Sequence, residues 1–490
     1  MSDSWPLEPD AETLSGWLSQ ASAMVVAQLE ALPTAPARGD VGAAGLAVAQ
    51  AVSLPIAEHA APGGMAAVLE RVVTAAGASL GTPGPGYFAY IPGGGIPSAA
   101  VASLVANALN RYTGLSAAAP ALCRLEADVL SWLAAEFGYD PVRARGLLTS
   151  GGSLANFSAL VTARHVAFGD TGDYSRAVVY ASSQAHHSVA KAAALAGIPT
   201  TGVRMVAIDD RCRMDAAALD AQIREDLRAG LRPFAIVSAA GTTNTGAVDP
   251  LPAVCDIAAE HGVWHHVDAA YGGGFILCDE GKRRLVGIDR ADSVTFDPHK
   301  GMFLPYGSGC LLVADGAALK RAHGAAAAYL QDFDAFEREG ESPSPAEYGP
   351  ELSRPYRGLS LWLPLQLHGA APFREAAAEK LALATRFAEG LQRLIDEGAP
   401  IEILDPPQLS VVPFRLRRQP GEALAAYNAR NARWMAGTND RLRAYLSSTT
   451  LPVVDGEAFT LRVCILSFRT HQAHVDHALQ DLAEALAGVV

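Results

Sequence analysis

The chain has 490 residues, of which 50% are hydrophobic and 18% are charged, and its formal net charge is −13. This length and composition predict a globular protein of two or three domains with at least one large core. The negative charge argues against nucleic acid or an anionic membrane as a partner, because both require a basic face.

Features that would indicate secretion or membrane insertion are missing from the sequence. The six cysteines lie far apart without a CxxC pair, which is typical of a reduced protein. The first residues, MSDSWPLEPDAETL, lack the basic and apolar segments of a signal peptide, and the Ala-rich stretch 41–62 is interrupted by polar residues and proline. We therefore expect a cytoplasmic protein.

Residues 1–97 are expected to form a helical arm followed by a pocket loop. Apolar side chains recur at helical spacing within 11–32, and a second helix is expected near 65–77. We expect the Gly-, Ala- and Pro-rich stretch between them to be an extended linker. The segment GTPGPGYFAYIPGGGIP (81–97) is too rich in glycine and proline for regular structure, and it could line a pocket or pack as a surface loop.

Helices and short apolar strands alternate in residues 98–368, which we expect to be the large domain. Continuously hydrophobic strands are covered on both faces, which predicts an α/β architecture with a mostly parallel sheet. Ligands of such sheets bind beyond the carboxyl ends of the strands. The expected strands are 147–150, 177–182, 204–208, 234–240, 263–268, 293–297 and 309–314.

Residues 369–490 are expected to form a smaller C-terminal α/β domain after a Pro- and Glu-rich loop at about 330–355. A long helix is expected at 371–398 and a closing helix at 471–489. Between them the pattern favours a βαβ-like unit, with strands at 401–404, 410–416 and 460–466.

The segment SVTFDPHKGM (293–302) places His299 and Lys300 directly after an apolar strand. Burying an unpaired ammonium is costly, so a lysine kept there usually has a chemical use. A desolvated lysine is suited to Schiff-base formation with a carbonyl cofactor. For this pair alone, a surface lysine at a strand–loop junction is the alternative.

The segment HHVDAAYGGG (265–274) ends another apolar strand at Asp268. A buried carboxylate needs a cationic partner, and the pyridinium nitrogen of pyridoxal 5'-phosphate (PLP) is such a partner. Ala270 is small enough for a flat ring to lie against it. The alternative, that Asp268 caps the next segment, leaves the glycines unexplained.

Three further segments could complete a PLP site. TSGGSLAN (149–156) turns through two glycines into a helix, whose amides could bind a phosphate together with the Ser153 hydroxyl, although the same pattern is an ordinary N-cap. In ASSQAHHSVAKAA (181–193), His186 could stack on the ring face opposite Ala270, or be a polar residue at a helix start. In GTTNTGAVDP (241–250), Thr243 offers a further hydroxyl.

Together and in this order, these motifs resemble the group II PLP-dependent decarboxylases, the family of aromatic-L-amino-acid decarboxylase and its bacterial relatives. The resemblance runs from about Tyr87 to Arg469 and is densest at TSGGS, QAH, GTT, HVDAAY and PHK. It implies the aspartate aminotransferase fold (fold type I), PLP as the cofactor and a homodimer. It also implies decarboxylation of an L-amino acid, with an aromatic one as the first choice.

The resemblance assigns roles to individual residues. Lys300 carries PLP, Asp268 contacts the pyridine nitrogen, and His186 stacks on the ring. The residues implied for the cofactor are Gly152, Ser153, His186, Thr243, Asp268, Ala270, His299 and Lys300. Those implied for catalysis are Lys300, His186 and Tyr348, the last as proton donor from the loop near 330–355. Those implied for the substrate are Tyr90, Ile91, Pro92 and Thr243.

The chain departs from the family pattern in three places. Asp297 stands where many members have asparagine, and its carboxylate would repel a phosphate. Tyr348 precedes RGLSLW (357–362) by a shorter gap than the loop tyrosine of the family, and the segment lacks the lysine. In the pocket loop, Ile91 and Gly93 replace the bulkier residues of the family, so a branched aliphatic or acidic amino acid is also a possible substrate.

Other functions also stay open. An aminotransferase or a lyase would share the same lysine, aspartate and phosphate cradle, whereas an aldehyde synthase is associated with phenylalanine in place of the loop tyrosine. A metal-binding or scaffold protein could use His261, His265 and His266. Because adjacent residues of a strand point to opposite faces, His265 and His266 cannot easily bind one ion, and we expect no metal.

A homodimer is also expected from the chain itself. The segment YGSG (306–309) could reach the cofactor phosphate of a neighbouring subunit, and the N-terminal arm has little core of its own.

Overall fold

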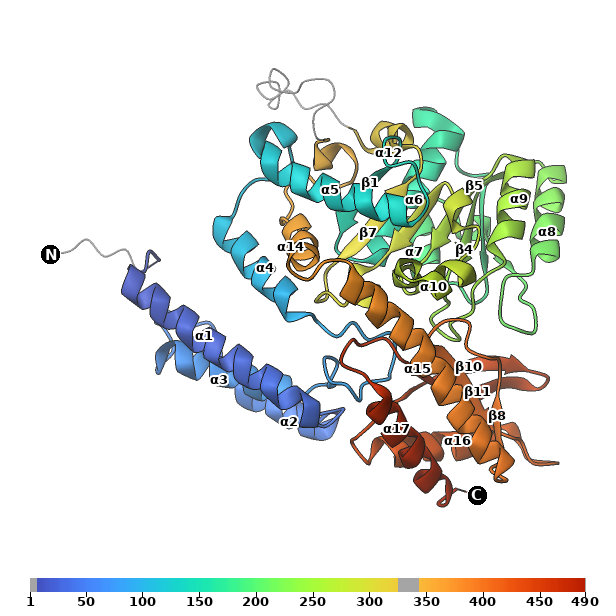
Figure 1. The fold of residues 1–490 in the computed structure, drawn as a ribbon. Coiled ribbons are helices and arrows are strands. Elements are labelled where there is room, and N and C mark those ends of the chain that lie inside the picture. Colours follow the sequence, from blue (N-terminus) through green and yellow to red (C-terminus); the bar gives the residue numbers. More distant parts are fainter. Residues whose placement is uncertain (1–6, 325–342, 490) are drawn as a thin grey trace.

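The computed structural model describes residues 7–324 and 343–489. Much of the loop expected at about 330–355 therefore lies outside the described residues. In Figure 1 the chain forms a protruding N-terminal arm, a large domain around one sheet, and a smaller domain at the C-terminus.

The arm consists of three helices, α1 (Ala11–Ala31), α2 (Ala43–Val52) and α3 (Gly64–Gly77). The two expected helices are confirmed, but the expectation of an extended linker between them is wrong. The sequence of α2, AAGLAVAQAV, is rich in alanine, the strongest helix former, and this outweighs the glycines and prolines around it. None of the three helices contains a buried residue.

The large domain is built on a seven-stranded sheet of order β1-β7-β6-β5-β4-β2-β3. Strand β7 is antiparallel to both of its neighbours, and the other neighbouring pairs are parallel, which confirms the predicted mostly parallel sheet. The strands are β1 (Arg145–Thr149), β2 (Ala177–Ser182), β3 (Val203–Val206), β4 (Arg232–Ala239), β5 (Trp264–Asp268), β6 (Ser293–Phe296) and β7 (Gly309–Val313).

The strands are buried along nearly their whole length because helices cover the sheet. The helices of the large domain, of which α4 packs on α14 rather than on the sheet, are α4 (Pro97–Leu109), α5 (Pro120–Glu136), α6 (Gly152–Phe168), α7 (Ser188–Leu195), α8 (Ala216–Arg228), α9 (Leu251–His261), α10 (Asp279–Arg284), α11 (Pro298–Gly301), α12 (Gly316–His323) and α14 (Gly358–His368).

The small domain differs from the expected βαβ-like unit, because its four-stranded sheet is antiparallel throughout, with the order β10-β11-β9-β8. Strand β10 was not expected: it is a half-exposed edge strand that contains a proline, so it lacks an apolar run. The elements are α15 (Ala371–Asp396), β8 (Ile401–Ile403), β9 (Val411–Leu416), α16 (Leu424–Asn439), β10 (Ser447–Val453), β11 (Gly456–Cys464) and α17 (Gln472–Leu486).

A segment from the N-terminal part of the chain is built into the small domain. The amide of Phe88 donates to the carbonyl of Tyr445 at 3.0 Å, and the amide of Cys464 donates to the carbonyl of Phe88 at 2.8 Å. The Phe88 ring is fully buried in the same cluster as Phe414 and Trp434. The expected pocket loop is therefore a packed connection between the arm and the small domain.

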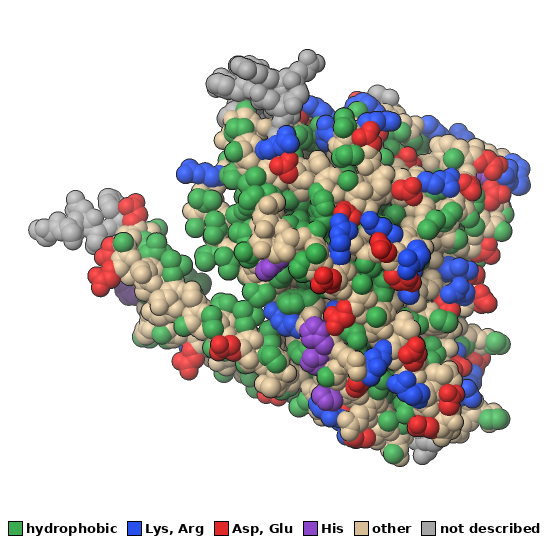
Figure 2. All heavy atoms as spheres, in the orientation of Figure 1, with side chains coloured by type: hydrophobic (Ala, Val, Ile, Leu, Met, Phe, Trp, Pro, Cys, Tyr) green, Lys and Arg blue, Asp and Glu red, His purple; other side chains and the backbone are tan. Residues whose placement is uncertain are grey.

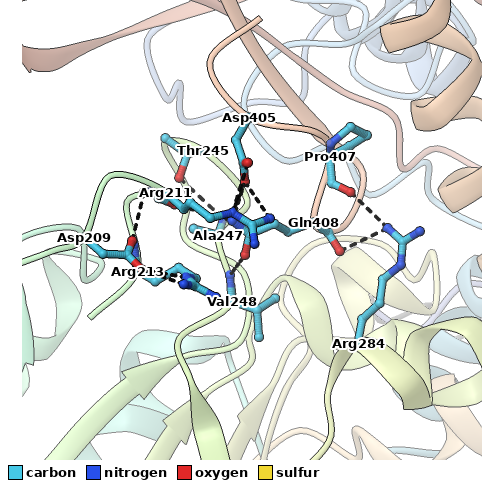
Figure 3. A network of polar contacts seen from close by, with 10 residues as sticks. All are labelled: Asp209, Arg211, Arg213, Thr245, Ala247, Val248, Arg284, Asp405, Pro407 and Gln408. Carbon is cyan, nitrogen blue, oxygen red and sulfur yellow. Dashed lines mark hydrogen bonds and ion pairs between the residues drawn. The ribbon is translucent and has the colours of Figure 1, made fainter. Parts of the chain in front are cut away.

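A polar network fastens the small domain to the large one (Figure 3). Arg211 forms an ion pair with Asp405 at 3.0 Å, and Gln408 accepts a hydrogen bond from the amide of Val248 at 2.8 Å. Arg284 donates to the carbonyls of residues 407 and 408. The residue that follows, Leu409, is fully buried against large-domain residues that include Gly241 and Gly272.

Candidate active site

A cavity of about 280 Å³ lies where β4, β5 and β6 end. Asp268 is the last residue of β5, Thr243 follows β4, and Lys300 lies in α11 directly after β6. Gly152 begins α6 after β1, and His186 lies between β2 and α7. The cavity is lined by the whole set assigned to the cofactor, Gly152, Ser153, His186, Thr243, Asp268, Ala270, His299 and Lys300.

Lys300 forms an ion pair inside this cavity. Its Nζ lies 2.9 Å from Oδ2 of Asp297, a residue that is only 2% exposed. The other oxygen, Oδ1, is buried and has no hydrogen-bond partner among the described residues. A Cβ on Gly152 would lie 3.1 Å from Oδ2, so the carboxylate is close to the start of α6.

Asp268 is held in place by hydrogen bonds but not by a cation. Its Oδ2 accepts from Nδ2 of Asn156 at 2.9 Å, and its Oδ1 accepts from the amide of Ala270 at 3.1 Å. Within the described part of the chain no basic side chain forms an ion pair with it. A buried carboxylate without a basic partner is suited to a cationic ring nitrogen.

The two histidines of the cavity are held in defined orientations. Burial is the main cause that lowers the pKa of His186, and its Nδ1 lies 2.7 Å from the hydroxyl of Ser188. Burial likewise lowers the pKa of His299, whose Nδ1 lies 2.6 Å from the carbonyl of Ser308. A carbonyl only accepts, so Nδ1 of His299 carries the proton. Both rings are thus neutral at neutral pH.

The start of α6 supplies a place for a phosphate. The first amides of a helix have no acceptor within it and carry the positive end of its dipole. Gly152 at this start is buried, and a Cβ there would also lie 3.1 Å from Cβ of Ala270, so glycine keeps the amides close to the cavity wall. With the carboxylate of Asp268 and the amine of Lys300, the residues present fit PLP.

The pocket-loop residues do not line this cavity. Tyr90 is 56% exposed and adopts a positive φ of 51°. Ile91 packs on the large core, and Pro92 is buried. The loop nevertheless reaches the wall of the cavity at Gly93, which lies against the backbone of His299. Any side chain at this position would collide with the carbonyl oxygen of His299.

Tyr348 also lies away from the cavity. Its side chain is 8% exposed and packs against residues of α6, β7 and α12, namely Ala155, Ala159, Leu311, Val313 and Leu319. It borders a different cavity, beside α5. Tyr348 is therefore part of the core and does not contact the cavity of its own chain.

Sequence reasoning missed several residues at the site. Asn156, Ser188 and Tyr271 also line the cavity. Asn156 could have been found, because it is a polar residue on the buried side of α6 four positions after Gly152. Arg462 on β11 does not line the cavity, but it holds a segment next to it, and its place far along the chain could not be predicted. It is 2% exposed and donates to the carbonyls of Tyr90 and Asn244.

The histidines of the metal alternative are not gathered around one point. His265 and His266 are buried on opposite faces of β5, and they contact Ser238 and Ser293 respectively. His261 pairs with Asp220 at 2.7 Å, next to Glu260.

Within the described residues, no helix is long and apolar enough to cross a membrane.

Comparison with known proteins shows the family of this chain. The family model described as "Pyridoxal-dependent decarboxylase conserved domain" matches residues 71–417. The chain belongs to this family. The decarboxylase is 34% identical to an aromatic-L-amino-acid decarboxylase of Bacillus atrophaeus over 386 residues, which cover 79% of this chain and 78% of the relative.

Other relatives differ in their substrates. A cysteine sulfinic acid decarboxylase of mouse is 32% identical over 332 residues, which cover 66% of each chain. Among solved structures, that of Oryza sativa TDC with PLP and tryptamine superposes with a TM-score of 0.88 at 25% identity, covering 99% of both chains. The chain is thus a PLP-dependent amino acid decarboxylase of fold type I.

Proposed function

We propose that the substrate is an aromatic L-amino acid, which the decarboxylase converts to the amine and carbon dioxide. The similarity to the bacterial aromatic-L-amino-acid decarboxylase, over more than three quarters of both chains, carries this proposal.

We propose the following roles for the residues of the cavity. Lys300 would hold PLP covalently, the start of α6 would hold the phosphate, and Asp268 would keep the ring nitrogen protonated. When bound, PLP supplies an electron sink for the pair left on Cα after carbon dioxide departs. His186, neutral and next to Asp268, would lie on the ring face and donate a hydrogen bond to the substrate.

The proton that Cα must receive needs a donor inside the cavity. Tyr348, the residue assigned by resemblance, packs in the core of its own chain instead. Lys300 and His186 both line the cavity and can carry a proton at Nζ and Nε2. We therefore favour these two groups as proton donors.

The experiment uses the purified holoenzyme and a panel of L-amino acids, with amine and carbon dioxide measured together. Aromatic substrates are expected to give the highest kcat/KM, with one amine per carbon dioxide. Borohydride treatment followed by peptide mapping is expected to find the cofactor on Lys300. Labelling of Lys191 or Lys282 instead would overturn the assignment of the lysine.

A second candidate, decarboxylation of an acidic amino acid, is favoured by Arg462. Its guanidinium donates to the Ser447 hydroxyl at 2.8 Å and to two backbone carbonyls, but it forms no ion pair among the described residues. Burial lowers the pKa of this arginine, so an anion beside it would be stabilising. Higher kcat/KM for glutamate, aspartate or cysteine sulfinate than for aromatic substrates would select this candidate.

We also propose that the enzyme is a homodimer in which a second copy covers the arm. Apolar side chains of α1 and α3 are exposed, namely Leu14, Trp17, Leu18, Val25, Val26, Val68 and Val72. Across from the arm, the body presents an apolar face on α4 and α14, which Figure 2 shows as a gathering of hydrophobic side chains. It includes Val101, Leu104, Val105, Leu109 and Leu367. Apolar surface of this extent typically marks an interface.

A further inference from the structure

A line of buried polar side chains runs behind Asp268 and His186. It begins at Trp264 on β5, crosses to β6, returns to β5 and reaches α6 and α7. Its members are Trp264, Ser293, His266, Asn156 and Ser188, and only Trp264 among them is more than slightly exposed. Each is joined to the next by a hydrogen bond of 2.8–3.0 Å.

Trp264 fixes the direction of the hydrogen bonds at this end. An indole nitrogen can only donate, so Nε1 of Trp264 donates to Oγ of Ser293 at 2.8 Å. The hydroxyl hydrogen of Ser293 is then free to point to Nδ1 of His266, which lies 2.8 Å away. Burial lowers the pKa of His266 to about 4, so the ring is neutral. Its single proton is on Nε2, because this nitrogen faces Oδ1 of Asn156 and an amide oxygen can only accept.

The amide of Asn156 joins His266 to Asp268. Nε2 of His266 donates to Oδ1 of Asn156 at 3.0 Å, with the hydroxyl of Thr295 as a second acceptor at 3.2 Å. The amide nitrogen of Asn156 must then face the other way. It donates one hydrogen to Oδ2 of Asp268 at 2.9 Å and the other to the hydroxyl of Ser188 at 3.0 Å.

The same chain determines the tautomer of His186. Because the Ser188 hydroxyl accepts from Asn156, its own hydrogen can point to Nδ1 of His186, 2.7 Å away. The backbone amide of Ser188, which can only donate, also points to this Nδ1 at 3.3 Å. Nδ1 of His186 is therefore an acceptor, and the proton of the neutral ring is on Nε2.

We propose that His266 and Asn156 are positioning residues, which orient Asp268 toward the cofactor nitrogen and keep the His186 proton on Nε2. Neither side chain would act on the substrate directly. The inference rests on the roles proposed above for Asp268 and His186. It adds that a histidine of β5 acts on both of them through one asparagine.

The test compares two adjacent histidines of β5. His266→Leu removes both ring nitrogens from this line of hydrogen bonds. His265→Leu is the matched control, since His265 is 1% exposed and bonded to the hydroxyl of Ser238, but on the opposite face of the strand. His266→Gln is the rescue variant, because its amide N–H can still reach Oδ1 of Asn156. The PLP dissociation constant, the absorption band of bound PLP and the thermal midpoint are measured for each.

Both leucine variants are expected to lower the thermal midpoint, since each leaves buried polar groups without partners. Only His266→Leu should also weaken PLP binding, by about tenfold for a lost hydrogen bond to a charged group, and displace the absorption band. His266→Gln should restore both.

Equal effects of His265→Leu and His266→Leu on PLP binding would overturn the proposal. It would also be overturned if His266→Leu kept the PLP dissociation constant and the absorption band of the parent enzyme. The roles of Asp268 and His186 are tested separately. If Asp268→Ala and His186→Ala both bind PLP normally with an unchanged band, the proposed site itself fails, whatever the outcome at His266.

Discussion

Asp297 and Lys300 lie three positions apart on one turn, so the carboxylate that would repel a phosphate is paired with the amine that would hold the cofactor. If Lys300 held PLP, its nitrogen would be shared between the cofactor and Asp297, whose Oδ1 has no partner among the described residues. A phosphate held at the start of α6 would lie near this buried carboxylate, and like charges repel strongly where the dielectric is low. Asparagine at this position would remove the repulsion.

We therefore predict that Asp297→Asn binds PLP more tightly, by up to about tenfold, or about 1.4 kcal/mol. Equilibrium titration of the apoenzyme with PLP measures the change. Asp297→Ala serves as the control, since it removes the charge without adding an amide donor, and it should also bind at least as tightly as the parent. Weaker binding in both variants would mean that the carboxylate itself holds the cofactor.

Asp268→Ala is predicted to bind PLP weakly and to lose nearly all turnover. Removing one partner of a buried ion pair costs about 3–5 kcal/mol, because the other charge is left without compensation. Spectroscopic titration with PLP and assays at saturating PLP separate the two effects. Parent-like turnover at saturation would show that the ring nitrogen is supported by another group.

At the scale of elements, the segment around Tyr348 illustrates how a loop residue can belong to the core. We predict that Tyr348→Phe leaves the amine formed per carbon dioxide unchanged, because the ring keeps its contacts with α6, β7 and α12. The measurement is the yield of amine and aldehyde under air and under argon. If Tyr348→Phe formed aldehyde only under air, Tyr348 would protect the reaction from dioxygen. Because Tyr348 lies away from the cavity of its own chain, the protected site would then be that of another subunit.

The strands of the large domain could be predicted from the sequence because they are buried on both faces and read as continuous apolar runs. The cofactor residues could also be predicted from the sequence, because they follow strand ends and therefore meet at one edge of the sheet. Strand β10 could not be predicted, since only two of its seven residues are buried. Contacts made by Arg462 and Tyr348 depend on packing between distant segments, which no local pattern encodes.

At the scale of the whole molecule, the exposed apolar faces of the arm and of α4 predict a dimer that depends on them. Leu104→Asp, on the face of α4, is expected to shift the protein toward monomer in sedimentation velocity. Charging an apolar interface is costly because the added carboxylate loses its water. Val142→Asp is the control, since Val142 is 78% exposed and lies outside these faces. A Leu104→Asp protein that sediments like the parent would exclude this face from the interface.

The joining of residues 86–90 to the small domain affects the order in which the chain can fold during synthesis. The amide of Tyr90 donates to the hydroxyl of Ser447, 357 positions later, and the other buried members of the Phe88 cluster all lie between residues 383 and 486. Domains generally form from the N-terminus as the ribosome proceeds. The aromatic segment at 87–90 therefore leaves the ribosome early and must stay uncovered while the whole large domain is made. Any transcript truncated before β9 would release a chain with this segment still exposed, and such a chain is a natural substrate for chaperones and proteases.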